Sequence, residues 1–159
     1  MKQFRLFNLI WLAIAVAIIC LDQLTKSLVM NHLQLYQAIK ITPFFNILLS
    51  FNTGAAFGLF NQASGWQQWL FGCVAVVVSS AIVIILLRQP REQWLNNLGM
   101  SFILGGALGN LIDRLTLGYV IDFLHFHLGQ WSWPIFNVAD SMICIGAGLL
   151  LLSMLWRVE

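Results

Sequence analysis

Two aspartates in the C-terminal third of the chain, Asp122 and Asp140, have surroundings suited to an acid and base pair. Asp122 lies in the apolar run VIDFL, which offers its carboxyl no obvious partner, and burial in such a setting raises the pKa of a carboxyl. Asp140 follows Asn137 by three positions at the predicted start of a helix, where negative charge is stabilised. Two such carboxyls could share one proton and activate a water. Taken alone, however, the spacing of Asn137 and Asp140 favours an ordinary helix cap.

Two further groups of polar residues have helical spacing. Asp22 and Lys26 are four residues apart with the acid first, which favours a structural ion pair along one helix. Asn110, Asp113 and Arg114 lie on one side of a predicted helix, where they could form a polar contact between helices or contact a substrate. Arg114 could also act as the charge partner of Asp113. The spacing leaves these alternatives open.

Residues 52–58 (NTGAAFG) change from polar to small within an apolar setting. Such a segment, with Asn52 and Gly54 at its start, suits either a tight turn or a backbone that approaches a ligand closely.

His125 and His127 would share one face of a strand, as zinc ligands can. A catalytic zinc needs three protein ligands, and the remaining histidine is far away in the sequence, so we expect no metal here.

The composition is that of a membrane protein. The chain has 159 residues, of which 60% are apolar and 9% charged, whereas soluble domains contain about 25% charged residues. So few charges cannot cover the surface of a soluble domain of this size. The composition therefore excludes a soluble enzyme, a nucleic-acid-binding protein and a disordered chain.

Four apolar stretches are long enough to cross a bilayer, at about residues 9–28, 68–87, 95–112 and 138–156. More bases flank one side of these spans than the other, so we expect both termini to be cytoplasmic. The five bases assigned to the inner side are Lys2, Arg5, Arg88, Arg91 and Arg157, against Lys26, Lys40 and Arg114 outside. Four of the six acids then lie near the outer face, namely Asp22, Asp113, Asp122 and Asp140.

The outer segments contain strand-like patterns. Residues 39–51 are apolar and partly β-branched, which predicts short strands or a surface-lying amphipathic element, and residues 120–128 alternate with the period of a strand. We expect residues 30–65 to form a platform and lid at the membrane surface.

Ser101, Gly105 and Gly109 recur every four residues and predict a smooth face for helix packing. The predicted fold is an all-α membrane protein with four transmembrane helices and a small extracytoplasmic β-rich platform, in one domain over residues 1–159.

The order of the polar motifs resembles that of the bacterial lipoprotein signal peptidases, or signal peptidase II, a family of four-helix membrane aspartyl proteases. The similar segments are residues 22–26 (DQLTK), 52–58 (NTGAAFG), 105–114 (GGALGNLIDR), 120–123 (VIDF) and 136–141 (FNVADS). They occur in the family's order and extend across most of the chain. A small proton-coupled transport protein and a purely structural assembly factor are the rival interpretations, and the second leaves Asp122 unexplained.

The resemblance implies that the enzyme cuts a prolipoprotein just before a cysteine that already carries diacylglycerol. It implies a bacterial cytoplasmic-membrane enzyme in contact with membrane lipid, with no cofactor, metal or nucleic-acid partner, and we expect it to be a monomer. It also implies a role for each motif residue. The catalytic pair would be Asp122 and Asp140. The residues that line or support the site would be Asn52, Gly54, Asn110, Arg114 and Asn137. Asp22, Lys26 and Asp113 would have structural roles.

Overall fold

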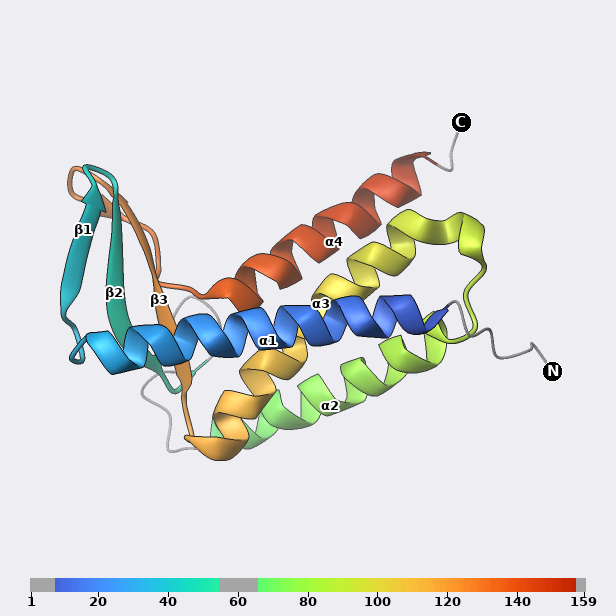
Figure 1. The fold of residues 1–159 in the computed structure, drawn as a ribbon, viewed down its shortest axis with the longest axis horizontal. Helices are drawn as coiled ribbons and strands as arrows, with labels where there is room; N and C mark the ends of the chain where they lie inside the picture. The colour runs from blue at the N-terminus through green and yellow to red at the C-terminus, as the bar shows by residue number, and fades with distance from the viewer. Residues whose placement is uncertain (1–7, 55–65, 157–159) are drawn as a thin grey trace.

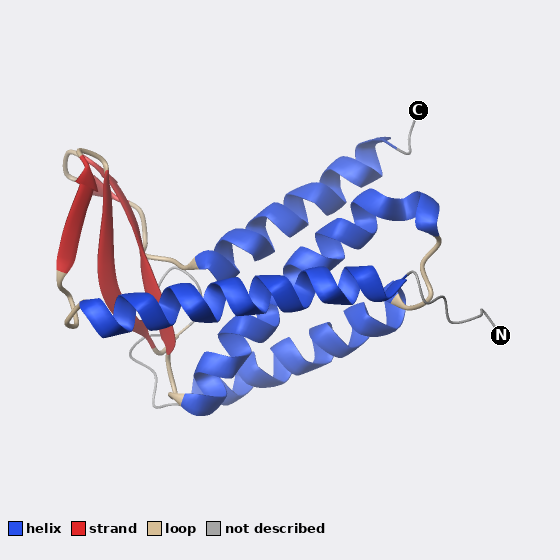
Figure 2. Ribbon diagram, viewed as in Figure 1, coloured by secondary structure: helices blue, strands red, loops and turns tan. Residues whose placement is uncertain are grey.

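Four long helices stand beside a small antiparallel sheet in the computed structural model, which describes residues 8–54 and 66–156. The helices form one bundle, and the strands lie at one end of it (Figures 1 and 2). The elements in chain order are α1 (Leu9–His32), β1 (Ala38–Thr42), β2 (Phe45–Asn52), α2 (Trp66–Leu86), the short 3-10 helix η3 (Arg91–Gln93), α3 (Trp94–Thr116), β3 (Val120–Leu128), β4 (Trp131–Ser132) and α4 (Val138–Trp156).

Each of the four long helices is apolar enough and long enough to cross a membrane, as the sequence predicted. The predicted spans differ from the helices mainly at the sheet end, where α1 continues to His32 and α3 to Thr116. The apolar pattern stops earlier because Asp113 and Arg114 interrupt it. The backbone remains helical there since these side chains have polar partners inside the bundle.

Helix α3 contacts the other three long helices, and its small residues allow two of them to approach closely. A Cβ atom added to Gly105 would lie 2.7 Å from Ile18 of α1, and one added to Gly106 would overlap the carbonyl oxygen of Ala139 of α4. The predicted packing face of Ser101, Gly105 and Gly109 is therefore confirmed for the contact with α1. The sequence did not indicate the second small-residue face, toward α4.

The strands are ordered β1-β2-β3-β4, and all neighbouring pairs are antiparallel. This confirms the predicted strands in residues 39–51 and 120–128. The register pairs Ser50 with Asp122 and Asn52 with Val120, which brings the end of β2 beside the start of β3. Burial does not alternate over the first four residues of β3, because both faces of the strand are covered there. Residues 55–65 of the predicted platform and lid lie outside the described residues.

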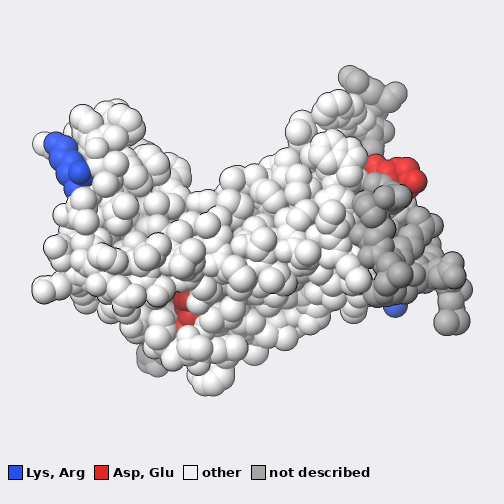
Figure 3. Space-filling model, in the orientation of Figure 1, with Lys and Arg blue, Asp and Glu red and all other residues white. Residues whose placement is uncertain are grey.

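The bundle has two distinct ends. Helix α1 begins, α2 connects to α3, and α4 ends at the end opposite the sheet (Figure 1). Charged atoms in Figure 3 are confined to these ends and to a small acidic spot where the sheet meets the bundle, while the middle of the visible face is uncharged. This distribution suits a bundle whose middle is surrounded by lipid. Three of the predicted inner bases, Lys2, Arg5 and Arg157, lie outside the described residues.

The close contact of α3 and α4 predicts a difference between two glycines of α4. A Cβ at Gly146 would lie 2.6 Å from the carbonyl oxygen of Gly99, whereas a Cβ at Gly148 would have no atom within 4 Å. We expect Gly146→Ala to destabilise the folded protein by about 1–3 kcal/mol. Gly148→Ala should be neutral or stabilise it by up to about 1 kcal/mol, the helix propensity of alanine over glycine. Thermal unfolding in detergent measures both, and equal melting temperatures would contradict the packing described here.

Candidate active site

The side chain of Asn137 joins Asp122 and Asp140, which come from different elements. Its Nδ2 donates a hydrogen bond of 2.7 Å to Oδ1 of Asp122. Its Oδ1 accepts a hydrogen bond of 2.8 Å from the backbone N–H of Asp140. Asn137 directly precedes α4, so the start of that helix brings Asp140 toward the buried part of β3. The two aspartates that the sequence singled out therefore belong to one cluster.

Asp122 is 2% exposed, and its hydrogen-bond partners are neutral amides. Asn52 Nδ2 donates to its Oδ2 at 2.9 Å, in addition to the bond from Asn137. Burial, followed by the nearby charge of Asp140, raises the pKa of Asp122 to about 7, and the amide donors only partly offset this. The partners that the local sequence did not reveal come from β2 and from the residue before α4.

Asp140 occupies the first turn of α4 and forms a reciprocal cap with Asn137. The backbone N–H of Asn137 donates to Asp140 Oδ2 at 3.3 Å, in return for the bond from Asp140 N–H to Asn137 Oδ1. Asn110 Nδ2 donates to Asp140 Oδ1 at 2.8 Å. The capping interpretation is thus confirmed, and the same contacts also fix the carboxylate beside Asp122.

A buried group of charges lies next to this pair. Lys26 Nζ is 2.8 Å from Asp22 Oδ2 and 2.8 Å from Asp113 Oδ2, and it donates to Asn110 Oδ1 at 2.9 Å. The predicted ion pair of Asp22 and Lys26 is confirmed, and the interpretation of Asn110 and Asp113 as an interhelical polar contact is also confirmed. The suggested pairing of Asp113 with Arg114 is wrong, since Lys26 is the cation that contacts Asp113. Sequence reasoning missed Gln23, whose Nε2 donates to Asp113 Oδ1 at 2.8 Å.

Arg114 points away from Asp113 toward the turn after β2. Its guanidinium donates to the carbonyl oxygens of Gly54 and Asn110, each at 3.2 Å, and lies 5.7 Å from the ring centre of Phe71. The N–H of Gly54 donates to Asn52 Oδ1 at 2.9 Å, so residues 52–54 form a side-chain-closed turn. The rest of this motif, residues 55–58, lies outside the described residues. Arg114 and Asn52 thus connect the turn to the cluster around Asp122.

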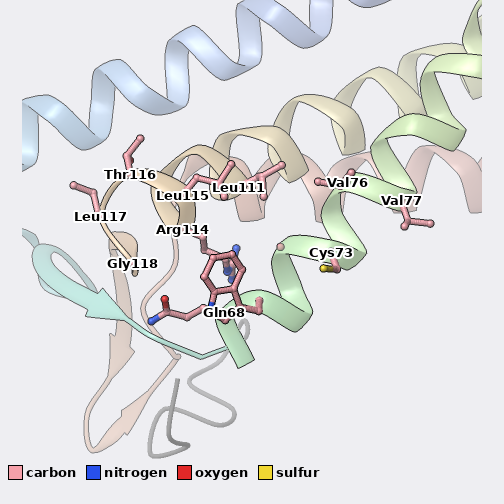
Figure 4. A pocket seen from close by; sticks show the side chains of 12 residues that line it. Gln68, Cys73, Val76, Val77, Leu111, Arg114, Leu115, Thr116, Leu117 and Gly118 are labelled. Atoms are coloured by element: carbon pink, nitrogen blue, oxygen red, sulfur yellow. The ribbon is translucent and has the colours of Figure 1, made fainter. Parts of the chain in front are cut away.

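Arg114 also lines a groove of about 630 Å³ between α2 and the end of α3 (Figure 4). Gln68 and Val76 of α2 and Leu111 and Leu115 of α3 are among the other lining residues. The groove is therefore largely apolar, with the cationic side chain of Arg114 in its lining. The sequence did not predict it, because the groove depends on how the two helices pack.

The arrangement of acids bears on the two rival chemistries. Asp22, Asp113, Asp122 and Asp140 all lie where the bundle meets the sheet, so the described residues offer no chain of acids across the bundle of the kind proton transport uses. The His125 and His127 rings stack at 5.5 Å on β3. Within residues 8–54 and 66–156, no three potential metal-ligating side chains of His, Cys, Asp or Glu are grouped.

Comparison with known proteins identifies the family. The family described as signal peptidase (SPase) II, Peptidase_A8, matches residues 14–156. The lipoprotein signal peptidase of Teredinibacter turnerae is 46% identical over 140 residues, covering 88% of this chain and 83% of that protein. The lipoprotein signal peptidase of Alteromonas mediterranea is 48% identical over 154 residues, covering 97% and 85%. A bacterial membrane enzyme solved by the in meso method at 2.3 Å resolution has a TM-score of 0.85 and 29% identity, covering 100% of this chain and 94% of its own. The chain therefore belongs to the signal peptidase II family, Peptidase_A8.

Proposed function

We propose that this chain removes signal peptides from prolipoproteins and that Asp122 and Asp140 are its catalytic pair. The observation that carries the proposal is the Asn137 bridge, which holds a buried carboxyl and a helix-capping carboxylate in one cluster. Membership of an aspartic-type peptidase family supports it. Both aspartates and the amides that contact them belong to one chain, so the proposed catalytic pair does not require a second copy.

In the proposed reaction, Asp122 enters protonated and Asp140 ionised. Asp140 accepts a proton from a water while the water oxygen bonds to the scissile carbonyl carbon, and Asp122 donates its proton to the carbonyl oxygen. The tetrahedral intermediate then breaks its C–N bond. The carbonyl oxygen returns its proton to Asp122, and Asp140 delivers its proton to the leaving nitrogen. The raised pKa of Asp122 supports its role as the initial acid.

We further propose that the substrate cysteine carries diacylglycerol and is cut on its N-terminal side. A lipidated residue keeps its acyl chains in the bilayer, so its scissile bond remains near the membrane surface. The apolar groove beside Arg114 offers a place for an acyl chain close to the aspartates. The exposed apolar side chains of Ile39, Ile41 and Phe44 on the sheet end give the enzyme a second contact with membrane lipid.

The proposed location is the bacterial cytoplasmic membrane, with the sheet and the aspartates at its outer face and both termini cytoplasmic. Arg88 and Arg91 lie in the connection between α2 and α3, at the end opposite the sheet (Figure 1). Basic residues in short connections favour the cytoplasmic side. An outer position of the sheet also matches a substrate whose lipid lies in the outer leaflet.

The catalytic assignment predicts that Asp122→Asn and Asp140→Asn each lower kcat by at least about 100-fold, because each removes one half of an acid and base pair. Release of the signal peptide from a diacylglyceryl-modified prolipoprotein by purified enzyme measures this. Glu92→Gln is the control, since Glu92 is exposed in η3 at the far end of the bundle and should keep normal turnover. Near-normal turnover by either folded aspartate variant would refute the assignment.

The pKa of Asp122 predicts how activity depends on pH. Its pKa is raised to about 7, so the proposed acid is protonated below that pH and loses its proton above it. We therefore expect kcat/KM to fall about tenfold per pH unit on the alkaline side of about pH 7. Melting temperatures at each pH establish that the enzyme remains folded. A kcat/KM that stays level up to pH 9 would contradict Asp122 as the initial acid.

The proposed orientation predicts which engineered cysteines are accessible from outside the cell. With Cys20, Cys73 and Cys144 replaced by alanine, Gln130→Cys at the turn between β3 and β4 should react with a membrane-impermeant maleimide in intact cells. Glu92→Cys should react only after the membrane is permeabilised. The reverse labelling pattern would place the sheet and the aspartates in the cytoplasm.

A further inference from the structure

Lys26 is 1% exposed, and the proposed reaction does not use its charge. Its ammonium contacts the carboxylates of Asp22 and Asp113 and the side-chain oxygen of Asn110. Burying an ion pair is weak support for stability, because well-packed apolar side chains often stabilise a core as much. The position of these charges therefore requires another explanation.

Each of the two carboxylates also accepts a backbone hydrogen bond from a different element. Asp22 Oδ1 accepts from the N–H of Ala139 at 2.9 Å, and Asp113 Oδ2 accepts from the N–H of Ile121 at 3.1 Å. Ala139 is the residue directly before Asp140, and Ile121 is the residue directly before Asp122. One buried cation thus connects through two carboxylates to the backbone beside both aspartates of the site.

Asn110 adds a third connection, to a side chain. Its Oδ1 accepts from Lys26, and its Nδ2 donates to Asp140 Oδ1 at 2.8 Å. Since the oxygen of this amide faces the ammonium, the nitrogen must face Asp140. Lys26 therefore orients the amide that holds the Asp140 carboxylate.

We propose that Lys26, Asp22 and Asp113 are positioning residues that hold α4 and β3 at the separation the two aspartates need for catalysis. This inference rests on the proposed function of the pair. Hydrogen bonds to ionised acceptors are short and directional, so the charged group restrains both N–H groups more strictly than neutral acceptors do. Reacting groups must be held within fractions of an ångström, and a displacement of about 1 Å can lower the rate about 100-fold.

Gly109 provides a way to move one carboxylate without changing any charge. A Cβ atom added there would lie 2.7 Å from Asp22 Oδ2, so Gly109→Ala must shift that carboxylate relative to Ala139. Gly105→Ala is the matched control on the same face of α3. Its Cβ would lie equally close, 2.7 Å, to Ile18 of α1, and its three nearest atoms belong to Ile18 and Ala15 rather than to the charged group.

The test compares both purified full-length variants on a diacylglyceryl-modified prolipoprotein. We expect Gly109→Ala to lower kcat about 10- to 100-fold with KM within about twofold, and to move the amide-proton NMR resonance of Ala139 upfield. Gly105→Ala should lower the melting temperature yet keep kcat and the Ala139 resonance. If the charged group had a purely structural role, any loss of kcat in either variant would equal the loss of folded enzyme. That result would contradict the proposal.

Asp113→Asn tests the second connection and decides the matter if Gly109→Ala does not fold. One carboxylate oxygen of Asp113, Oδ1, accepts from Gln23 Nε2. The other, Oδ2, contacts Lys26 Nζ and the N–H of Ile121. In Asp113→Asn an NH2 group replaces one of these oxygens, so the donors at that position lose their acceptor. We expect a lower kcat, an unchanged KM and a shifted Ile121 amide resonance. The positioning role would be overturned if folded Asp113→Asn had the kcat of the wild type and Gly109→Ala either failed to fold or also had the kcat of the wild type. Turnover retained by Asp122→Asn or Asp140→Asn would instead overturn the catalytic pair itself.

Discussion

The structure depends on keeping Asp122 buried without giving it a cation in direct contact. A buried carboxyl needs hydrogen-bond donors, and a direct cation would hold it ionised. Asn52 and Asn137 supply neutral donors, so Asp122 is satisfied and still has a pKa of about 7. Asp22 and Asp113, by contrast, share the ammonium of Lys26. The fold therefore gives amide partners to Asp122, the proposed catalytic acid, and a shared cation to Asp22 and Asp113.

This separation of roles requires several elements to meet within a small volume. The amides come from β2, α3 and the residue before α4, and the cation comes from α1. Close approach of the helices is possible because Gly106 and Gly109 of α3 leave room for the backbone of α4 and the carboxylate of Asp22. The register of β2 against β3 brings Asn52 to Asp122 from the other side. The sheet is thus part of the site as well as a surface at the end of the bundle.

Much of this architecture could be predicted from residue types and spacing. Apolar length predicts the four helices, and alternation predicts β3, because these properties depend on local sequence. The ion pair of Asp22 and Lys26 and the cap formed by Asn137 and Asp140 are also local, at helical spacings of four and three residues. The family resemblance then identified which polar residues belong together.

The remaining features depend on contacts between distant segments. Nothing near Asp113 in the sequence indicates that Lys26, rather than the adjacent Arg114, is its partner, since that choice depends on how α1 crosses α3. The Asn52 donor to Asp122 depends on strand register, which a one-residue shift would change. The groove lined by Arg114 and Gln68 exists only after α2 packs against α3. Contacts between residues that are dozens of positions apart therefore could not be predicted from the sequence and were found only in the structure.

The protonation of Asp122 is tested most directly by a carboxyl-carbon NMR titration of this residue in the folded enzyme, repeated in Asp140→Asn. Wild-type Asp122 should keep its proton up to about pH 7. The pKa of Asp122 should be lower in the variant, because the nearby negative charge of Asp140 is one of the two causes that raise it. An Asp122 that titrates near the ordinary value of 3.8, or one whose pKa does not respond to the loss of Asp140, would contradict the central claim.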